Sequence, residues 1–430
     1  FWSFQGSAID WGKDYIFPIS DGFAQDNWMG LQPDSRTGGG VPVVDLWTKK
    51  MGLAIAHIEP VPKLISLPVE VQSDKKLKIA VRNDLNKILP PQTSYTTLKT
   101  IVITHSLDYF NALSTYSKLI TAQGLQMKKP SDEAYEAIWC GWGYESDFTI
   151  DDILGTIPKL KEFGIHWVVI DDRWFDRYGD WNVRTDNFPE GEAQIKALVD
   201  TLHKQGFKVK IWWNPTTAQS ADDLGDWPSA TPGISDVAKN HPDWLIMDEN
   251  GNYPQCGRKM YFFCPSIPAV QDYIRNLTIK FIKDWGFDGH KLDAFWTVPP
   301  CYNPKHHHKY PAESHEDLPQ LLRIIYETTK SLKSNSVTEI CNCGTTQDFW
   351  QAQYIDQPVT SDPVGSWQVR KRIKVFKALM GPKTAAYADH VELTEIKFLE
   401  DIELDIGRDF ASAVGTGGVV GTKFTWPGGP

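Results

Sequence analysis

The chain has 430 residues, which exceeds one average domain and predicts two domains or one barrel with an appendage. A hydrophobic content of 41% and a charged content of 23% are typical of a globular protein with a large core. The net charge of −10 argues against a nucleic-acid partner, because phosphate backbones require a basic face. No apolar run approaches the length of a membrane span, so we also expect no membrane partner. The start, Phe1 to Phe4, has neither an initiator Met nor a signal-peptide pattern, so we expect a processed or truncated start and leave the compartment open.

The chain is rich in Trp and poor in Cys. Its 18 Trp residues suit a protein that stacks indole faces on sugars, although Trp also fills large cores. Six cysteines are too few for disulfides to stabilise a chain of this length. Cys341-x-Cys343 has no second pair at zinc-finger spacing. The run His306–His308, with His315 nearby, lacks the spacing of a ligand set, so we favour a polar loop over the mouth of a site. We therefore predict no metal and no cofactor.

Residues 1–128 are predicted to form an N-terminal β-sandwich domain with a trailing helix. β-branched runs separated by Pro and Gly lie at 41–47, 52–58 and 64–71, and residues 77–82 alternate between apolar and polar side chains. A helical pattern over 107–123 presents Tyr109, Leu113 and Tyr116 on one face, which indicates packing rather than binding. The polar stretch that begins at Lys128 marks the expected domain boundary.

Residues 129–430 are predicted to form an α/β domain, a (β/α)8 TIM barrel. Helical patterns separate most of eight apolar strand candidates, at 137–142, 167–170, 209–213, 289–293, 338–341, 358–362, 384–388 and 417–420. A long insertion, 216–266, precedes the fourth strand, and insertions of that length are usually functional when they are well punctuated. Catalytic residues of such barrels lie at the carboxyl ends of the strands.

Carboxylates occur at three of those strand ends. The second strand ends in Asp171-Asp172-Arg173-Trp174, where two carboxylates beside an indole could grip sugar hydroxyls, although a surface turn explains the pair almost as well. The fourth strand ends at Asp293, which could instead cap the next segment, and the sixth ends at Asp362. Glycoside hydrolysis requires two facing carboxylates, one ionised nucleophile and one proton donor. Lys291 shares a strand face with Asp293, so its charge favours an ionised Asp293 as nucleophile and leaves Asp362 as the acid/base.

Several passages in a fixed order resemble the clan-D glycoside hydrolases, nearest the family 36 α-galactosidases (melibiases). Residues 137–142 resemble the first strand of that family, and Asp171-Asp172-Arg173-Trp174 resembles its DDGW motif. Further matches follow: Gly179-Asp180-Trp181 with Phe188-Pro189-x-Gly191 (GDW and FPxG), Gly257-Arg258-Lys259-Met260 (GRxQ), Lys291-Leu292-Asp293 (KWD), and Cys341-Asn342-Cys343-Gly344 followed by Ser361-Asp362 (CxSG…SD). The resemblance covers residues 136–425, and the β-rich start resembles the sandwich that precedes the family's barrel.

The resemblance implies the same catalytic pair, Asp293 as nucleophile and Asp362 as general acid/base. It implies that the sugar contacts come from Asp171, Asp172, Trp142, Trp212, Arg258, Lys291, Cys341 and Arg370. The chain departs from the family's pattern around the sugar pocket, where Arg173 replaces Gly, Asn214 replaces Glu, Leu292 replaces Trp, and Thr345-Thr346 replace Gly. These departures bear on the identity of the sugar more than on the reaction type.

We therefore expect a retaining exo-α-glycosidase that removes terminal α-galactosyl residues from oligosaccharides or glycoconjugates by double displacement. The alternatives are an α-N-acetylgalactosaminidase, a transglycosidase of the same clan, and a carbohydrate-binding protein without catalysis. The expected partner is a carbohydrate substrate, and a homo-oligomer is left open. The family usually adds a C-terminal β domain after the barrel, which is either absent from this protein or outside this chain.

Overall fold

The computed structural model describes residues 1–7, 15–30, 39–83, 89–221, 231–256, 259–293, 297–342, 348–361, 363, 365–389 and 410–424, without the side chains of 145–147. Within these ranges, every helix is too short or too polar to cross a bilayer.

A curled parallel sheet forms the centre of the molecule. Its described strands run in the order β18-β17-β16-β13-β12-β11-β19, and every neighbouring pair is parallel. Their bounds are β11 (Ile138–Cys140), β12 (Trp167–Ile170), β13 (Lys208–Trp213), β16 (Gly289–Leu292), β17 (Val337–Ile340), β18 (Gln357–Pro358) and β19 (Gly421–Thr422). Tyr387 joins the two edges, because it makes parallel bridges to both Val359 and Val419. The sheet is therefore the predicted (β/α)8-type barrel, with a short seventh strand at Tyr387.

The sixth and eighth strands differ in extent from the prediction. β18 ends at Pro358, with one further bridge at Val359, and Ser361 has a left-handed φ of 57° that stops the extended run. The eighth strand begins later than expected, since Gly417 (φ 70°) ends a helical turn before the chain extends through Val419 to β19.

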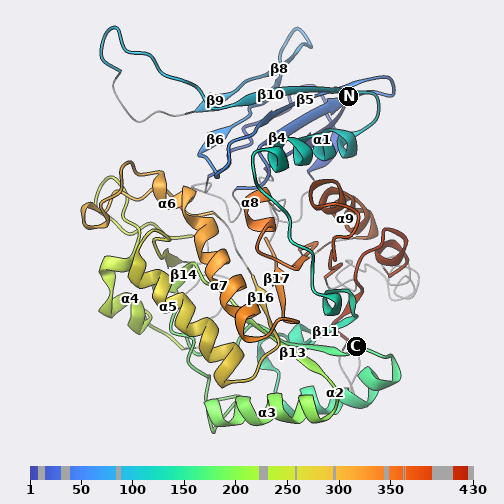
Figure 1. The fold of residues 1–430 in the computed structure, drawn as a ribbon, viewed down its shortest axis with the longest axis vertical. Coiled ribbons are helices and arrows are strands. Elements are labelled where there is room, and N and C mark those ends of the chain that lie inside the picture. Colours follow the sequence, from blue (N-terminus) through green and yellow to red (C-terminus); the bar gives the residue numbers. More distant parts are fainter. Residues whose placement is uncertain are drawn as a thin grey trace.

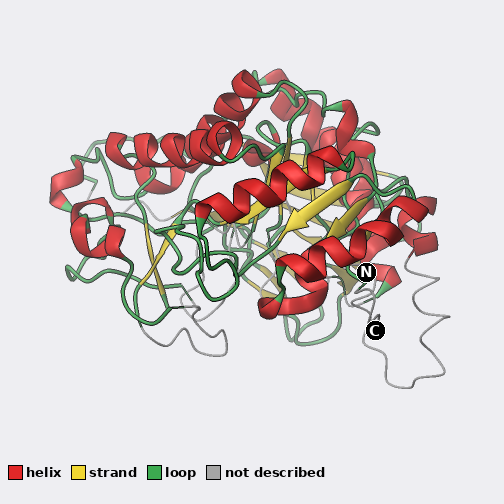
Figure 2. Ribbon diagram, turned by 90° about the horizontal axis from the view of Figure 1, so that it is seen from below, coloured by secondary structure: helices red, strands yellow, loops and turns green. Residues whose placement is uncertain are grey.

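Helices surround the sheet, as Figure 2 shows. The long ones are α2 (Ile150–Glu162), α3 (Glu192–Lys204), α5 (Pro268–Ile279), which continues as a π-helical turn η4 (Lys280–Asp284), α7 (Leu318–Leu332) and α9 (Ser366–Met380). Local signals set their ends: Thr149 and Asp152 form a capping box at the start of α2, and Gly164 follows its end with a φ of 66°. Their apolar faces and the strands share one large core.

The predicted insertion before the fourth barrel strand is structured. It contains the antiparallel strand pair β14 (Thr217–Gln219) and β15 (Met260–Phe262) and, between these strands in the chain, the short helix α4 (Asp236–Asn240) and the 3-10 turn η3 (Pro242–Trp244). Short elements also follow other barrel strands: η2 (Gly141–Asp147), η5 (Pro304–His306), α6 (Glu313–Glu316) and α8 (Phe349–Ala352). These elements lie around the carboxyl ends of the strands.

The N-terminal region consists of antiparallel sheets. The largest has the order β10-β5-β4-β1-β2, with bounds Thr100–His105, Gly52–His57, Val43–Trp47, Trp2–Gln5 and Ile16–Pro18. A second sheet joins β3 (Ala24–Gln25), β7 (Val69–Val71) and β8 (Leu77–Ile79), and a third pairs β6 (Ile65–Ser66) with β9 (Arg82–Asn83). A small apolar cluster around Val44, Leu67 and Val69 contains side chains from the first two sheets. The region has the layered antiparallel architecture expected of it.

Helix α1 (Tyr109–Ala122) joins the N-terminal sheets to the barrel. Asp108 caps its start by accepting a hydrogen bond from the Phe110 N–H, and Leu113 and Tyr116 are fully buried. These side chains share one cluster with the sheet residue Phe4 and with Trp350 of α8. η1 (Asp132–Tyr135) then leads into β11. In Figure 1 the N-terminal sheets lie on the side of the barrel where α6 and α8 follow their strands. The domain boundary after residue 128 stays a prediction.

Candidate active site

β16 carries Lys291 into the barrel and ends one residue before Asp293. The strand begins at Gly289. A larger residue would not fit there, because its Cβ would lie 2.0 Å from the carbonyl oxygen of Val337 on β17. Lys291 is 3% exposed, and its Nζ lies 2.8 Å from Oδ2 of Asp171, which follows β12. Two parallel strands separated only by β13 thus bring the predicted cation and one predicted sugar-binding carboxylate together inside the barrel.

Lys291 is held in its charged form by the carboxylates around it. Burial by itself would lower the pKa of its ammonium group, but Asp171 above all, then Cys140, Asp389 and Asp293, raise that pKa well above its usual value. The ammonium group therefore stays protonated across the physiological range. Its contact partner is Asp171, and Asp293 is a weaker contributor to its pKa, so the expectation that the charge of Lys291 keeps Asp293 ionised stays a prediction.

Asp293 is oriented by residues at the end of β13. Its Oδ2 accepts a hydrogen bond of 2.9 Å from Nε1 of Trp212, and its backbone carbonyl accepts one of 3.1 Å from Nδ2 of Asn214. Its backbone N–H donates to the Trp213 carbonyl at 3.2 Å. Asp293 itself is half-buried, so its carboxylate is fixed by the fold and still reaches the surface of the site.

Asp171 and Asp172 are both buried, with 2% of each residue exposed. Oδ2 of Asp171 accepts from the Cys140 thiol at 2.9 Å, and its Oδ1 accepts from the backbone N–H of Asp172 at 2.9 Å. The Tyr178 hydroxyl lies 3.1 Å and 3.2 Å from the two carboxylate oxygens of Asp172. These contacts place the pair inside the barrel beside Lys291 rather than in an exposed turn.

Trp212 packs within an aromatic cluster. Its ring stacks on Phe175 at 5.8 Å with an interplanar angle of 6°, and Tyr178 meets it edge-on at 6.1 Å. Only 1% of Trp212 is exposed, so the structure places it as a support for Asp293. Trp142 is half-buried in η2, directly after β11.

The remaining predicted site residues have different positions. The thiol of Cys341, buried after β17, donates to Oγ of Ser361 at 3.4 Å, next to Asp362 in the chain. Arg370 is exposed on α9, and its Nη1 lies 2.8 Å from Oγ of Ser412. Asp362 and Arg258 lie outside the described residues.

Four site residues were not singled out from the sequence. Cys140 and Tyr178 hydrogen-bond to the two aspartates after β12, and the buried Asp389 contributes negative charge near Lys291. Arg372 is 2% exposed, and its Nη1 donates 2.6 Å hydrogen bonds to the carbonyl oxygens of Thr360 and Ser361, so it fixes the backbone that leads to residue 362. From the sequence alone there was no sign that Arg372 is buried, because it lies in the cationic run Arg370-Lys371-Arg372.

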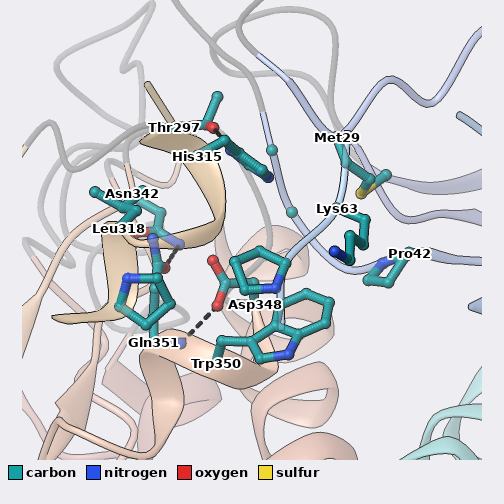
Figure 3. Close-up of a pocket in the computed structure, with 14 residues that line it drawn as sticks. Met29, Pro42, Lys63, Thr297, His315, Leu318, Asn342, Asp348, Trp350 and Gln351 are labelled. Atoms are coloured by element: carbon teal, nitrogen blue, oxygen red, sulfur yellow. Dashed lines mark hydrogen bonds between the residues drawn. The ribbon is translucent and has the colours of Figure 1, made fainter. Parts of the chain in front are cut away.

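A small cavity of about 20 Å³ lies between the N-terminal sheets and the loops that follow the barrel strands (Figure 3). Its lining includes Lys63 from the N-terminal region, Thr297, Asn342 and Asp348. Burial raises the pKa of Asp348 to about 7, although this carboxylate caps α8 by accepting from the Gln351 N–H. The cavity has room for about one water molecule.

The fold and these residues define a barrel enzyme with buried carboxylates at its strand ends. A family model described as melibiase matches residues 94–399, which is well over half of the chain. The chain belongs to the melibiase family of glycoside hydrolases.

Curated relatives include an A type blood α-D-galactosamine galactosaminidase of Flavonifractor plautii, which is 29% identical over 403 residues, covering 89% of this chain and 34% of the relative. α-Galactosidase 1 of Pediococcus pentosaceus is 28% identical over 191 residues, covering 41% of this chain and 24% of the relative. The chain therefore spans about a third or less of the length of these relatives.

Solved structures confirm the fold. An α-galactosidase of Geobacillus stearothermophilus in complex with raffinose superposes with a TM-score of 0.66 at 17% identity, covering 98% of this chain and 58% of that chain. An α-galactosidase of Thermus thermophilus in complex with stachyose gives a TM-score of 0.66 at 16% identity, covering 98% and 86%. The predicted family, enzyme class and fold are thus confirmed.

Proposed function

We propose that this protein is a retaining exo-α-glycosidase that removes a terminal α-linked galactose-type sugar by double displacement. The observation that carries the proposal is the constellation at the carboxyl ends of β12, β13 and β16. There Lys291 and Asp171 form a buried ion pair, and Trp212 holds one oxygen of the half-buried Asp293. A fixed carboxylate at the same strand ends as buried acceptors and a cation suits a nucleophile that attacks a polyhydroxylated ring.

In this mechanism Asp293 attacks the anomeric carbon, and Asp362 protonates the departing oxygen and later activates water. Asp171 and Lys291 would bind hydroxyl groups on the non-reducing side of the sugar. The ammonium group of Lys291 keeps its proton for this role because the surrounding carboxylates raise its pKa. Asp172, held by Tyr178, would supply a second acceptor.

The two carboxylates are distinguished by substituting each in turn. We expect Asp293→Gly to abolish turnover of an aryl α-galactoside and to be rescued by azide, giving a β-galactosyl azide. Asp362→Ala should retain the first step with good leaving groups, which need little protonation. NMR of the first-formed sugar decides the stereochemistry, and an initial β-anomer would contradict the assignment of Asp293. Oligosaccharide products longer than the substrate would indicate transfer rather than hydrolysis.

A second candidate substrate is a terminal α-D-galactosamine, because the galactosaminidase of Flavonifractor plautii matches 89% of this chain. The pocket also has its own departure from the galactosidase pattern. Arg173 is 2% exposed with a φ of 81°, and its Nε lies 3.9 Å from Oδ2 of Asp172. A left-handed backbone explains why a glycine is usual at this position, and the side chain adds charge next to a sugar-binding carboxylate.

The sugar is identified by comparing kcat/KM for aryl α-galactoside, α-galactosaminide and α-N-acetylgalactosaminide in wild type and Arg173→Gly. If Arg173 shapes specificity, the ratio of these values changes in the variant by tenfold or more, which is about 1.4 kcal/mol. An unchanged ratio would exclude Arg173 as a determinant. No turnover of any of the three in the wild type would favour the carbohydrate-binding alternative.

A further inference from the structure

Four metal-ligating side chains meet in one place outside the predicted active site. Cys264 follows β15, and Cys301, His306 and His308 lie in the loop that follows β16. One ligand atom from each lies within 4.8 Å of all the others, and three of the four residues are buried. Among the residues that the structure describes, this is the one cluster of three or more His, Cys, Asp or Glu side chains whose geometry could hold a metal ion.

The distances suit a tetrahedral ion. Sγ of Cys301 lies 3.2 Å from Nδ1 of His306, and Sγ of Cys264 lies 3.3 Å from Nε2 of His308. Zinc bonds of about 2.0 Å to nitrogen and 2.3 Å to sulfur place the ligand atoms of a tetrahedron roughly 3.3–3.8 Å apart. Small movements of the side chains would therefore complete the coordination.

The outer ring atoms of both histidines already have partners. Nε2 of His306 lies 2.7 Å from the carbonyl oxygen of Asp243, so this nitrogen carries the proton and Nδ1 presents its lone pair to the cluster. Nδ1 of His308 lies 3.6 Å from a carboxylate oxygen of Glu313, which leaves Nε2 directed at Cys264. A carbonyl or carboxylate behind each ring is the usual arrangement around metal-bound histidine.

Both sulfur atoms also accept hydrogen bonds from the backbone. The backbone of Ser266 hydrogen-bonds to Cys264, and the backbone of Met247 hydrogen-bonds to Cys301. Backbone donors of this kind stabilise thiolates, which are the form that binds metal.

The backbone explains how neighbours in the histidine run reach the same point. His307 is exposed and has a left-handed φ of 54°, and the rings of His306 and His308 lie 5.6 Å apart on the other side. We expected this run to be a polar loop rather than a ligand set, since the spacing within the run is not that of a zinc motif. The missing ligand is Cys264, which only the tertiary fold brings to Cys301.

We propose that Cys264, Cys301, His306 and His308 bind a structural Zn²⁺ ion. Four protein ligands fill a tetrahedral coordination sphere and leave no open position for a substrate or water, so the role is structural rather than catalytic. The site would fasten the insertion before β16 to the loop after it. These segments already touch through hydrogen bonds from the Tyr302 N–H to the Met247 carbonyl (2.8 Å) and from Asn303 Nδ2 to the Leu245 carbonyl (3.4 Å). The proposal does not depend on the enzyme's substrate.

The test is the metal content of the purified full chain after it is supplied with Zn²⁺ and dialysed. We expect about one zinc per chain, as a four-ligand site requires. Cys264→Ser and His308→Ala should each lose most of the metal. Two matched controls should keep it: Cys256→Ser, another buried cysteine of the same insertion, and His307→Asn, whose side chain tolerates the left-handed backbone.

A spectroscopic measurement keeps the test valid if a ligand variant fails to fold. Chelator-treated wild type is titrated with Co²⁺, which in a tetrahedral thiolate site gives intense visible bands and a sulfur-to-metal charge-transfer band. We expect these bands at one equivalent, their displacement by Zn²⁺, and a lower melting temperature without metal. Wild type that binds neither ion would overturn the proposal. So would a mass 2 Da lower that reveals a disulfide between Cys264 and Cys301.

Discussion

Trp212 shows how one side chain links the aromatic core to the chemistry. Its ring is buried against Phe175, while its Nε1 donates to Oδ2 of Asp293. Trp174 extends the same cluster, since its own Nε1 donates to the carbonyl oxygen of Trp212 at 2.7 Å. Indoles can therefore serve the site without touching sugar, and the abundance of Trp in this chain reflects packing as well as recognition.

Trp212→Phe should lower kcat/KM by roughly 10- to 100-fold, because a hydrogen bond to a charged group is worth about 1.5–3 kcal/mol. The ionised form of Asp293 loses a donor, so the acidic limb of the kcat/KM profile should move to higher pH. Trp181→Phe is the control, since Trp181 lies in the same cluster and its buried Nε1 has no hydrogen-bond partner in the described part of the chain. A similar pH profile in both variants would show that Trp212 acts by packing alone.

Asp348 makes stability depend on pH. Burial raises the pKa of its carboxyl from 3.8 to about 7, so folding favours the protonated form. This stability is fully present below the unfolded pKa, and it is lost as pH rises through about 7.

Asp348→Asn keeps a good helix cap without the charge. Relative to wild type, the variant should become more stable between pH 4 and pH 8, by a few kcal/mol at about 1.4 kcal/mol per pKa unit. Equal pH dependence in urea melts of both proteins would refute this.

At the scale of elements, the barrel interior is held by polar pairs as well as by packing. Nζ of Lys210 on β13 lies 2.8 Å from Oε2 of Glu339 on β17, with the side chains of both fully buried, and it also hydrogen-bonds to Gln357 at the start of β18. Burial lowers the pKa of Lys210 and raises that of Glu339, and each partner's charge opposes the shift. Because β16 lies between β13 and β17 in the sheet, the pair links the two strands on either side of β16. Together with Gln357 it fixes the relative positions of β13, β17 and β18.

Removing one partner of this pair should destabilise the barrel by about 3–5 kcal/mol, because the other charge stays buried. Lys210→Met and Glu339→Leu each leave one such charge, so we expect low melting temperatures for both single variants. The double variant should recover much of the loss, with a coupling free energy well above zero in a double-mutant cycle. Additive losses would mean that hydrogen bonds from Gln357 and neighbouring groups stabilise each charge without its partner.

At the scale of the whole molecule, the N-terminal sheets and the barrel share a core through α1. Leu113 and Tyr116 lie in one apolar cluster with Trp350, Val375 and Leu379 of the barrel. Oγ of Ser117 on α1 donates to the Leu379 carbonyl at 2.6 Å, and Nζ of Lys63 lies 2.7 Å from Oε2 of Glu316 at the end of α6. A boundary after residue 128 therefore divides the chain at a place where its two parts remain in extensive apolar contact.

We expect the full chain to unfold in one calorimetric transition. Leu113→Ala removes a fully buried side chain of the shared cluster, which should cost about 2–5 kcal/mol and lower the midpoint of the whole transition. Leu332→Ala, at the partly exposed end of α7, should change it little. A second transition that appears in Leu113→Ala, with the barrel's own midpoint unchanged, would show that the two parts are independent.

The sequence by itself determined the elements and their order. Strand runs such as 167–170 and amphipathic helices reflect local periodicity, and ordered motifs such as Lys291-Leu292-Asp293 sufficed for the family and for Asp293 at a strand end. Asp362 and Arg258 stay predictions, since both lie outside the described residues. Only the tertiary structure decided the partners. It paired Lys291 on β16 with Asp171 after β12, two strands away in the sheet, made Trp212 a donor for Asp293, and brought Cys264 to Cys301 and the histidines. Such contacts depend on how separate strands and loops meet in space, which periodicity along the chain does not encode.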